Sequence, residues 1–341
     1  MLNEIRKDYL LNRWVAIATE RKRRPTDYIR KEPSAQTADR SSCPFCPGNE
    51  RMTPPAVLVY LKRKGCIVKE HDTDGLRHKD WLIRCVSNLY PAFSPPKKGE
   101  KNELGKAVGH HEVFVESPNH NEHPGVAETS QLIHVVNGYV DRLKALSSKP
   151  YVKYVSIFRN HGREAGASLS HTHSQIIATA VTPIVLSEEL KTSKEFYETC
   201  GKCVFCEILQ KEKGSSRFIW ENQSFVAFAP WAAVNPLEFW IAPKAHQATL
   251  LDMDRKSVND LADALKTCLA ALKLLLNDPP YNYGFHITPN MEEAGKYYHW
   301  HLEIYPKLSI WAGFEKSTGM YINVVPPEDA AQDLRQVIEN A

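Results

Sequence analysis

Two segments of the chain repeat apolar residues at the three- and four-residue spacing of an amphipathic helix. The first runs from about Ser130 to Leu146 and the second from Ser257 to Asn277, where Asp278-Pro279-Pro280 follows. A proline cannot continue a helix, because it lacks a backbone N–H and its ring clashes with the preceding turn. Each apolar stripe predicts that one face of its helix packs on a hydrophobic core.

Short runs of β-branched and aromatic residues, typical of strands, flank both predicted helices. They lie at residues 113–117, 154–158, 225–228, 237–241 and 283–287. Strands on either side of one helix, in each half of the chain, predict an α+β fold with antiparallel sheets and helices packed on them.

The two halves repeat the same order of motifs. A Cys-x-x-Cys pair is followed by strands, a single histidine, the helix, another strand, a polar loop and a His-x-His motif. The single histidine precedes the His-x-His motif by 51 residues in the first half (His120 to His171) and by 53 in the second (His246 to His299). These matching intervals predict one duplicated unit. We expect an N-terminal domain over residues 1–182, a C-terminal domain over residues 200–341, and a mostly polar linker over residues 183–200.

The composition is that of an ordinary globular protein, with 43% hydrophobic and 24% charged residues among 341. A formal net charge of +3 gives no electrostatic case for binding nucleic acid or a membrane surface. No apolar stretch approaches the roughly 20 residues that a membrane span requires. The first residues lack the layout of a signal peptide. We therefore expect a cytoplasmic protein with neither nucleic acid nor membrane among its partners.

Two cysteine pairs have the spacing of a metal site. Cys43-Pro-Phe-Cys46 and Cys203-Val-Phe-Cys206 are both followed by distant histidines. In a reducing compartment such pairs favour zinc over structural disulfides, with a redox motif as the alternative. A zinc-dependent binding module without enzymatic activity is the weaker interpretation, because zinc ribbons keep their pairs close and here 157 residues separate Cys46 from Cys203.

Three polar side chains occupy alternate positions after a glycine-containing loop: His171, His173 and Gln175. Side chains at alternate positions of an extended chain point to one face. A solvated strand edge would explain this pattern, and so would a row of groups facing a phosphate. Gly162 and Gly166 in the preceding loop would allow backbone amides to approach that phosphate.

The whole segment from Phe158-Arg-Asn160 through Ser168 to His171-Thr-His173-Ser-Gln175 resembles the active-site signature of the galactose-1-phosphate uridylyltransferases, a family of the histidine-triad superfamily. The resemblance runs nearly from end to end of the chain, and it implies a fold built from two histidine-triad-like units. Further matching motifs are Arg24-Pro25-Thr-Asp27, Cys43-Pro-Phe-Cys46, Asn88-Leu-Tyr-Pro91, Glu116-Ser-Pro-Asn-His120, Pro243-Lys-Ala-His246 and the tail from Gly313 to Asn323.

This resemblance implies a nucleotidyltransferase that moves a nucleoside monophosphate from a nucleoside diphosphate hexose to a hexose 1-phosphate or to phosphate. His173 would attack the α-phosphorus and carry the nucleotide covalently, and Gln175 would hydrogen-bond the transferring phosphoryl group. Imidazole suits the role because it is largely unprotonated near neutral pH. A histidine-triad hydrolase is the alternative enzyme, but that subfamily has a third histidine where Gln175 stands.

The resemblance also implies a set of substrate-binding residues, and a homodimer in which the tail completes the partner's site. The nucleotide pocket would contain Arg24, Asp27, Arg84 and Asn88. The phosphates would be held by Asn160, Gly166 and Ser168. The hexose or the acceptor phosphate would lie near Gly313, Phe314, Glu315 and Asn323.

About two zinc ions per chain follow from the same resemblance, each in a closed Cys2His2 site with a structural role. The ligands of the first site would be Cys43, Cys46, His120 and His171. The ligands of the second would be Cys203, Cys206, His246 and His299. His301 stands where the second half would carry its nucleophile, but Glu303 replaces the glutamine. A carboxylate repels a phosphate, so we expect the second half to be structural.

Two positions depart from the common uridylyltransferase signature. Thr172 stands where that signature has proline, and Ser174 where it has glycine. Plant ADP-glucose phosphorylase, a family member that transfers adenylyl groups to phosphate, has serine at both positions. We expect Ser174 to place a hydroxyl beside the transferring phosphorus and so to alter the space left for an acceptor. The base, uridine or adenosine, and the acceptor, hexose 1-phosphate or phosphate, both stay open.

Overall fold

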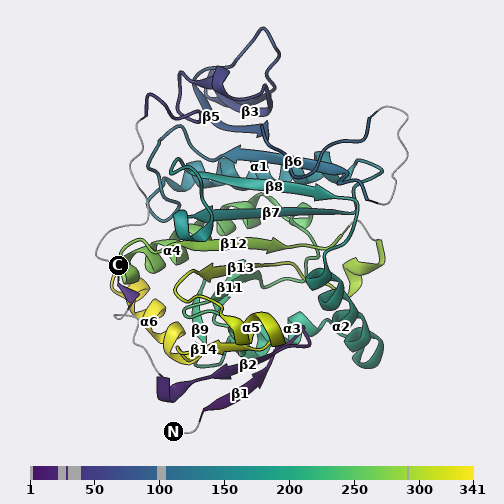
Figure 1. Cartoon of the computed structure of the whole chain (residues 1–341), viewed down its shortest axis with the longest axis vertical. Helices are drawn as coiled ribbons and strands as arrows, with labels where there is room; N and C mark the ends of the chain where they lie inside the picture. Colours follow the sequence, from purple (N-terminus) through teal and green to yellow (C-terminus); the bar gives the residue numbers. More distant parts are fainter. Residues whose placement is uncertain (1–2, 22–27, 30–39, 98–104, 290–291) are drawn as a thin grey trace.

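A computed structural model of the chain describes residues 3–21, 28–29, 40–97, 105–289 and 292–341. Within them, eleven strands form one antiparallel sheet that runs through both halves (Figure 1). The N-terminal half contributes, in spatial order, β4 (Cys66–Glu70), β3 (Ala56–Arg63), β5 (Trp81–Ser87), β6 (Gly109–Val115), β8 (His173–Thr179) and β7 (Tyr154–His161). The C-terminal half continues with β12 (Tyr281–His286), β13 (His301–Pro306), β11 (Phe239–Pro243), β10 (Phe225–Phe228) and β9 (Phe218–Glu221).

The two halves meet at β7 and β12, whose register sets Phe158 opposite Gly284 and Asn160 opposite Asn282. Outward from this junction the strands follow a matched order. It is β7, β8, β6, β5, β3 on one side and β12, β13, β11, β10, β9 on the other. The matched order supports the duplication that the repeated motifs predict.

Helices α1 (Thr129–Ser147) and α4 (Arg255–Leu276) lie on one face of the sheet and contact each other (Figure 1). They are the two amphipathic segments expected from the sequence. The side chain of Asp254 accepts a hydrogen bond from the Ser257 backbone N–H at 2.7 Å and so caps the start of α4. Asn277 ends it in a left-handed conformation. The predicted α+β class, with antiparallel strands and packed helices, is confirmed.

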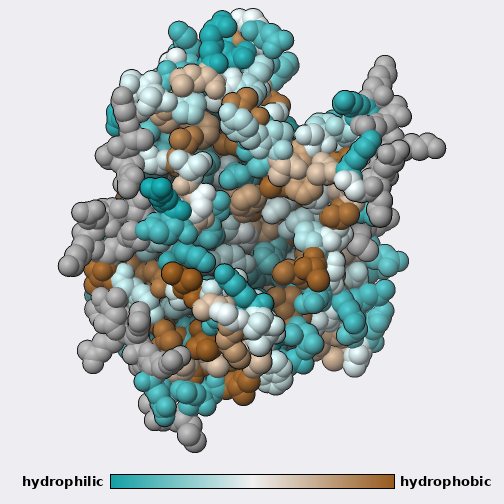
Figure 2. Space-filling view, in the orientation of Figure 1, coloured by the Kyte–Doolittle hydropathy of each residue, from teal (hydrophilic) through white to brown (hydrophobic). Residues whose placement is uncertain are grey.

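The opposite face of the sheet is partly open. In β7, Ile157 and Arg159 are buried, whereas Phe158 and Asn160, on the other face, are half-buried. The C-terminal part of this open face is covered by α2 (Ile184–Cys200), α3 (Val204–Glu212), α5 (Gly313–Thr318) and a small sheet of β1 (Glu4–Lys7), β2 (Trp14–Ile17) and β14 (Tyr321–Asn323). Figure 2 shows that this face is hollowed near its middle. Ser156 and Asn282 line a cavity of about 590 Å³.

The remaining elements are α6 (Pro327–Glu339), which packs beside α4 and β9, and short 3-10 turns. These turns lie at Thr19–Arg21, Glu50–Met52, Arg163–Ala165, Leu250–Asp252 and Glu292–Lys296. No helix within the described ranges is long and apolar enough to cross a membrane.

The segment expected to link the two halves, residues 183–200, forms helix α2 between β8 and α3. Its polar residues do not all face solvent, since Glu189 and Ser193 are buried. Glu189 accepts hydrogen bonds from the hydroxyl of Tyr298 at 2.7 Å and from the ring of His286 at 2.8 Å. A segment that is polar in sequence therefore packs against the C-terminal half.

Candidate active site

Strand β8 carries the two predicted catalytic side chains, His173 and Gln175, on the open face of the sheet. His173 is 7% exposed and Gln175 is half-buried. Nδ1 of His173 lies 2.7 Å from the backbone carbonyl of His171, which can only accept a hydrogen bond, so Nδ1 carries the proton. This leaves the lone pair of Nε2 available for attack. Burial lowers the pKa of His173 and so favours this neutral form.

The loop between β7 and β8 contains the two predicted phosphate-approach glycines. Gly162 and Gly166 have φ values of 81° and 93°, which residues with a side chain rarely adopt. The side chain of Asn160 lies beside this loop, since a Cβ added at Gly166 would be 3.6 Å from its Nδ2 atom. Phe158 pairs with Gln175 across the sheet, so Asn160 lies on the His173 side of that pair. Ser168 is exposed after the loop.

Gln175 is held from the neighbouring strand β6 by His111. Nδ1 of His111 accepts a hydrogen bond from the backbone N–H of Ala92 at 3.1 Å, so the ring carries its proton on Nε2. Nε2 donates to Oε1 of Gln175 at 2.7 Å. Nδ2 of Asn88 lies 3.1 Å from the same nitrogen. Because both atoms are donors with the ring in this tautomer, the contact is not a hydrogen bond, but it brings this predicted pocket residue next to Gln175. The sequence offered no motif around His111, and packing or solvent exposure was its expected role.

Thr172 and Ser174 point to the opposite, buried face of β8. The hydroxyl of Thr172 donates to Glu116 at 2.8 Å, and Arg159 forms an ion pair with the same carboxylate. Ser174 is fully buried, with its hydroxyl 2.7 Å from that of Tyr139. The expectation that Ser174 sets a hydroxyl beside the transferring phosphorus is therefore wrong, because adjacent residues of a strand face opposite sides of the sheet.

Tyr139 extends this buried network across the two halves. Its hydroxyl donates to Glu116 at 2.9 Å, so its oxygen must accept from Ser174 and from Tyr283 of β12, which lies 2.9 Å away. Burial raises the pKa of the Glu116 carboxyl, but the charge of Arg159 and the hydrogen bonds outweigh it and hold that pKa below its usual value. A charged Glu116 thus connects α1, β7 and the start of β8 beneath the site.

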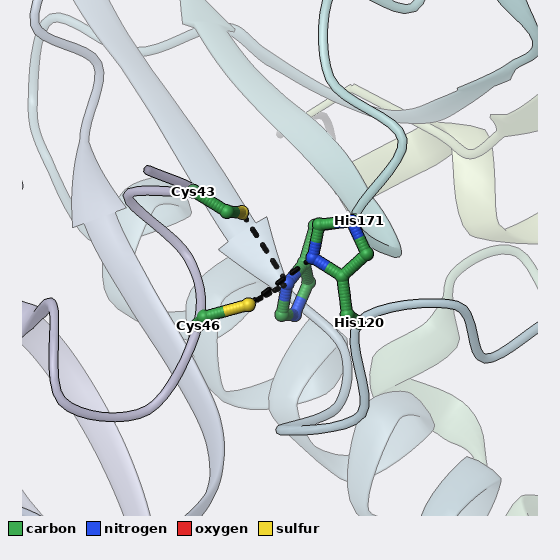
Figure 3. Close-up of side chains that lie close together, drawn as sticks. All are labelled: Cys43, Cys46, His120 and His171. Atoms are coloured by element: carbon green, nitrogen blue, oxygen red, sulfur yellow. Dashed lines mark hydrogen bonds between the residues drawn. The ribbon is translucent and has the colours of Figure 1, made fainter. Parts of the chain in front are cut away.

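Cys43, Cys46, His120 and His171 converge on one point (Figure 3), where one ligand atom from each lies within 4.8 Å of the others. The Sγ–Nδ1 distance is 3.1 Å from Cys46 to His120 and 3.6 Å from Cys43 to His171. A tetrahedral zinc ion with ordinary Zn–S and Zn–N bonds would set these atoms about 3.5 Å apart. Nε2 of His171 donates to the Ser117 carbonyl at 2.8 Å, which turns the Nδ1 lone pair to the centre. This donor set fits zinc.

The second predicted set, Cys203, Cys206, His246 and His299, converges in the same way. Cys206 Sγ lies 3.5 Å from Nδ1 of His246 and 3.6 Å from Nδ1 of His299. Nε2 of His299 donates to the Pro243 carbonyl at 2.9 Å, and Nε2 of His246 donates to a backbone carbonyl at the same distance. Both histidines therefore turn Nδ1 to the centre, and this set also fits zinc.

Two predicted substrate-binding residues are buried and engaged elsewhere. Arg84 is 1% exposed, and its guanidinium pairs with the buried carboxylate of Asp72 at 2.8 Å. Asn323 is fully buried, and its amide donates to the Ala233 backbone carbonyl at 2.9 Å. Arg84 lies in the same cross-strand row as His173, with Val115 of β6 between them, but its guanidinium is engaged by Asp72, and Asn323 lies in the small sheet.

The other predicted tail residues, Gly313, Phe314 and Glu315, form the start of α5. In Figure 1 this helix lies over the C-terminal half, away from β8. Glu315 accepts a hydrogen bond from the Ala312 backbone N–H at 2.9 Å, and Phe314 is 46% exposed. The predicted residues Arg24 and Asp27 lie outside the described residues.

Comparison with known proteins identifies the family. Residues 1–183 match the model described as galactose-1-phosphate uridyl transferase, N-terminal domain, and residues 119–341 match a domain of unknown function. ADP-glucose phosphorylase of Arabidopsis thaliana is 37% identical over 98% of this chain and 93% of its own length. The chain belongs to the galactose-1-phosphate uridylyltransferase family. Galactose-1-phosphate uridylyltransferase of Thermotoga maritima is 31% identical over 98% of both chains.

Solved structures of this uridylyltransferase family agree with the assignment. An ADP-glucose phosphorylase from Arabidopsis thaliana with bound ADP-glucose superposes with a TM-score of 0.81 at 34% identity, covering 98% of this chain and 99% of that one. A uridylyltransferase mutant superposes with a TM-score of 0.74 at 27% identity, covering 99% and 98%.

The second half of this uridylyltransferase family member repeats the geometry around His173, but a carboxylate engages the corresponding histidine, His301. Nδ1 of His301 lies 3.4 Å from the His299 carbonyl, as Nδ1 of His173 faces the His171 carbonyl. Nε2 of His301, however, lies 3.0 Å from the carboxylate of Glu303, and the ring is fully buried. The nitrogen that would attack is therefore already engaged, which agrees with the structural role expected for this half.

Two further buried clusters bring potential ligand atoms within 4.8 Å in the described part of the chain. They are Glu189, His286, His301 and Glu303, and His123, His161 and Asp278. Contacts among the protein's own side chains account for both: an ion pair of His286 in the first, and in the second an ion pair of Lys273 and a hydrogen bond of His161 to Asp278. The ring of His286 lies 2.8 Å from Glu189, and Asp278 is 3.0 Å from both His161 and the ammonium of Lys273.

Proposed function

We propose that this nucleotidyltransferase moves a nucleoside monophosphate from a nucleoside diphosphate hexose to a phosphate oxygen of an acceptor, through a covalent nucleotidyl-His173. The observation that carries the proposal is the state of the imidazole. Its Nδ1 proton is held by the His171 carbonyl, and the side chains of His173, Gln175 and Asn160 share one face of the sheet. A buried, neutral imidazole in this orientation is an activated nucleophile.

Two displacements would complete the reaction. First, Nε2 of His173 bonds to the α-phosphorus as its bond to the oxygen of hexose 1-phosphate breaks, and the electron pair leaves on that oxygen. Then an acceptor phosphate oxygen attacks the same phosphorus, and the P–N bond breaks with its electrons returning to Nε2. The hydrogen bond from Nδ1 to the carbonyl of His171 stabilises the positive charge that the ring gains in the first step. Amide donors from Gln175 and Asn160 would stabilise charge on the phosphoryl oxygens.

Zinc would act here as a structural cross-link, one ion in each Cys2His2 set. In the first set, His171 is both a ligand and the residue whose carbonyl orients His173. An ion at that position would hold the nucleophile in register. The side chains of that set are all buried, as a closed structural site requires.

ADP-glucose with phosphate as acceptor is the first candidate pair of substrates. It is favoured by the 37% identity to an ADP-glucose phosphorylase across nearly the whole chain. UDP-glucose with galactose 1-phosphate is the second candidate, because the Thermotoga maritima uridylyltransferase is 31% identical over the same extent. The two pairs differ in base and in acceptor, but they use the same steps at His173.

A cytoplasmic homodimer is also proposed, in which the tail of one chain reaches the site of the other. This arrangement would give a role to α5, whose Phe314 is 46% exposed yet lies away from β8 within one chain. Ile310, just before α5, is 89% exposed, and Ile184 at the start of α2 is 76% exposed. Figure 2 shows apolar patches on this face of the molecule, where a partner would cover them.

Trapping the intermediate tests the nucleophile. Wild-type protein mixed with ADP-glucose or UDP-glucose labelled in the nucleoside should acquire an acid-labile label, as expected for a phosphoramidate. His173→Gly should acquire none while keeping its fold. His301→Gln is the matched control from the second half, and it should be labelled like the wild type. Near wild-type turnover by folded His173→Gly would exclude the mechanism.

Comparing kcat/KM for the two substrate pairs tests the substrate specificity. We expect kcat/KM for ADP-glucose plus phosphate to exceed that for UDP-glucose plus galactose 1-phosphate by about a hundredfold, since one unmatched buried polar group in a base pocket is worth that much discrimination. The reverse preference would assign the chain to the second pair, and failure of both pairs would reject both candidate acceptors.

A further inference from the structure

We propose that Asn282, from the C-terminal half, and His111 are positioning residues that fix which end of each phosphate-facing amide points at the substrate. The proposal rests on the proposed function, in which Asn160 and Gln175 face the phosphates. An amide side chain has an NH2 group that attracts a phosphate oxygen and a carbonyl oxygen that repels it, and a half-turn about its last bond exchanges the two. The orientation therefore decides whether an amide assists the reaction or opposes it.

Asn282 sets the orientation of Asn160 across the junction between the halves. The two residues are paired in the register of β12 and β7. Nδ2 of Asn282 donates to Oδ1 of Asn160 at 2.8 Å and to the backbone carbonyl of Ala165 at 2.7 Å. Because a backbone carbonyl only accepts, the second bond fixes the orientation of Asn282 itself. The carbonyl end of Asn160 is then engaged, and its NH2 end remains for a ligand beside Gly166.

His111 does the same for Gln175 from the other side. The Ala92 backbone N–H occupies Nδ1 of the His111 ring and so places the ring proton on Nε2. That proton is donated to Oε1 of Gln175, and the NH2 group of Gln175 remains on the open face. Each amide oxygen, that of Asn160 and that of Gln175, accepts a hydrogen bond from a side chain on the neighbouring strand. The orientation of each donor side chain is fixed in turn by a backbone group, the carbonyl of Ala165 or the N–H of Ala92. Two amides are thus presented with the polarity that a phosphate requires.

Asn282 has a location that suits this role. It is half-buried on the open face and lines the cavity of about 590 Å³, so it is not a core residue on which folding depends. It also contacts Ala165 inside the phosphate loop, so one residue from the second half orders both the loop and the amide beside it. The second half would then contribute to the reaction without a nucleophile of its own.

A double-mutant cycle separates this role from a general structural one. Asn282→Ala frees the amide of Asn160 to turn, and we expect the rate of nucleotide transfer to His173 to fall about fivefold, the worth of one ordinary hydrogen bond. Asn282→Asp offers an acceptor to Asn160 and so turns its carbonyl towards the phosphate. For this variant we expect a loss of about a hundredfold, the magnitude of losing one donor to the reacting phosphoryl group. Each substitution is then repeated in an Asn160→Ala background, where no amide remains to be oriented.

In that background Asn282→Ala should cost about twofold or less, since only its bond to the Ala165 carbonyl is then lost, and the loss from Asn282→Asp should shrink to less than tenfold. Equal losses in both backgrounds would overturn the proposal, since they would show that Asn282 acts through packing or through the added charge alone. His111→Phe in wild-type and Gln175→Ala backgrounds provides a second, uncharged cycle with the same expectation. Melting temperatures of all variants should lie within a few degrees of their own background.

Binding of ADP and UDP by calorimetry is measured on the same set of proteins, because it does not depend on turnover. A wild type that is never labelled would refute the proposed function, while the affinity for the diphosphate would still report whether Asn282 acts through Asn160. If the wild type is labelled but the paired substitutions have additive effects on both the transfer rate and the affinity, the proposed function holds and the positioning roles of Asn282 and His111 are refuted.

Discussion

Removing the hydroxyl of Tyr139 should destabilise the protein far more than the loss of one atom suggests. That hydroxyl is fully buried, donates to Glu116 and accepts from Ser174 and Tyr283. In Tyr139→Phe, two buried hydroxyls lose their acceptor and a buried carboxylate loses one of its donors. Each unsatisfied buried group costs about 1–3 kcal/mol, so we expect a total of about 2–4 kcal/mol after the two hydroxyls partly reorient.

Ser174→Ala should cost only about 1 kcal/mol, because Tyr139 keeps its bond to Glu116 and its donor Tyr283. The double variant Tyr139→Phe/Ser174→Ala should be about 1 kcal/mol more stable than the sum of the two single losses predicts. The reason is that it contains no Ser174 hydroxyl to be left without its Tyr139 partner. Urea unfolding at constant zinc concentration measures all four proteins. A cost below about 0.5 kcal/mol for Tyr139→Phe, or strictly additive costs, would show that this network does not act as a unit.

Three further outcomes are expected. Elemental analysis should find about two zinc ions per chain, and chelation that removes them without changing activity or melting would contradict both sites. Cys43→Ser should lower activity and stability together, because His171 loses its anchor, whereas Cys203→Ser should lower mainly stability. Burial alone would lower the pKa of His286, but the carboxylates of Glu189 and Glu303 raise it to about 9. Because the pKa of His286 is higher in the folded than in the unfolded protein, its charged ring stabilises the fold. This contribution is complete below about pH 6.5 and is lost as the pH rises through about 9. The melting difference between wild type and His286→Gln should therefore narrow from pH 7 to pH 10, and a constant difference would contradict this pairing.

Features that depend on the spacing of nearby residues could be predicted from the sequence. The helices at 129–147 and 255–276 followed from apolar periodicity and from the stop at Pro279, which act within a few turns. The grouping of Cys43, Cys46, His120 and His171 followed from motifs and from resemblance, and the structure brings these ligand atoms together. Of the three alternating residues His171, His173 and Gln175, the last two share one face of β8, whereas His171 precedes the strand and its ring faces Cys43 and Cys46.

Contacts between distant segments escaped prediction. The expected position of Ser174 beside the phosphate follows from its replacing a glycine of the common signature, but the two-residue period of its strand turns the hydroxyl to Tyr139 instead. Arg84 and Asn323 are assigned to the substrate by resemblance, but their partners are buried groups that no local pattern reveals. Asn282 meets Asn160 only through the register of two strands 122 residues apart. The inward-facing Glu189 and Ser193 of α2 look like solvent-exposed residues in the sequence, so the packing of this connecting helix on the C-terminal half has no local signal.

The junction of β7 with β12 has a consequence for how this molecule diverged from a repeated ancestor. Two identical units joined edge to edge as separate chains would be bound by twofold symmetry, so any substitution would appear in both sites at once. When the two copies are joined within one chain, each can acquire substitutions that the other lacks. Glu303 can stand where Gln175 stands, and Asn282 can specialise as an accessory of its neighbour. Covalent linkage thus permits one copy to lose its catalytic residues and to become a structural support whose side chains position those of the other copy.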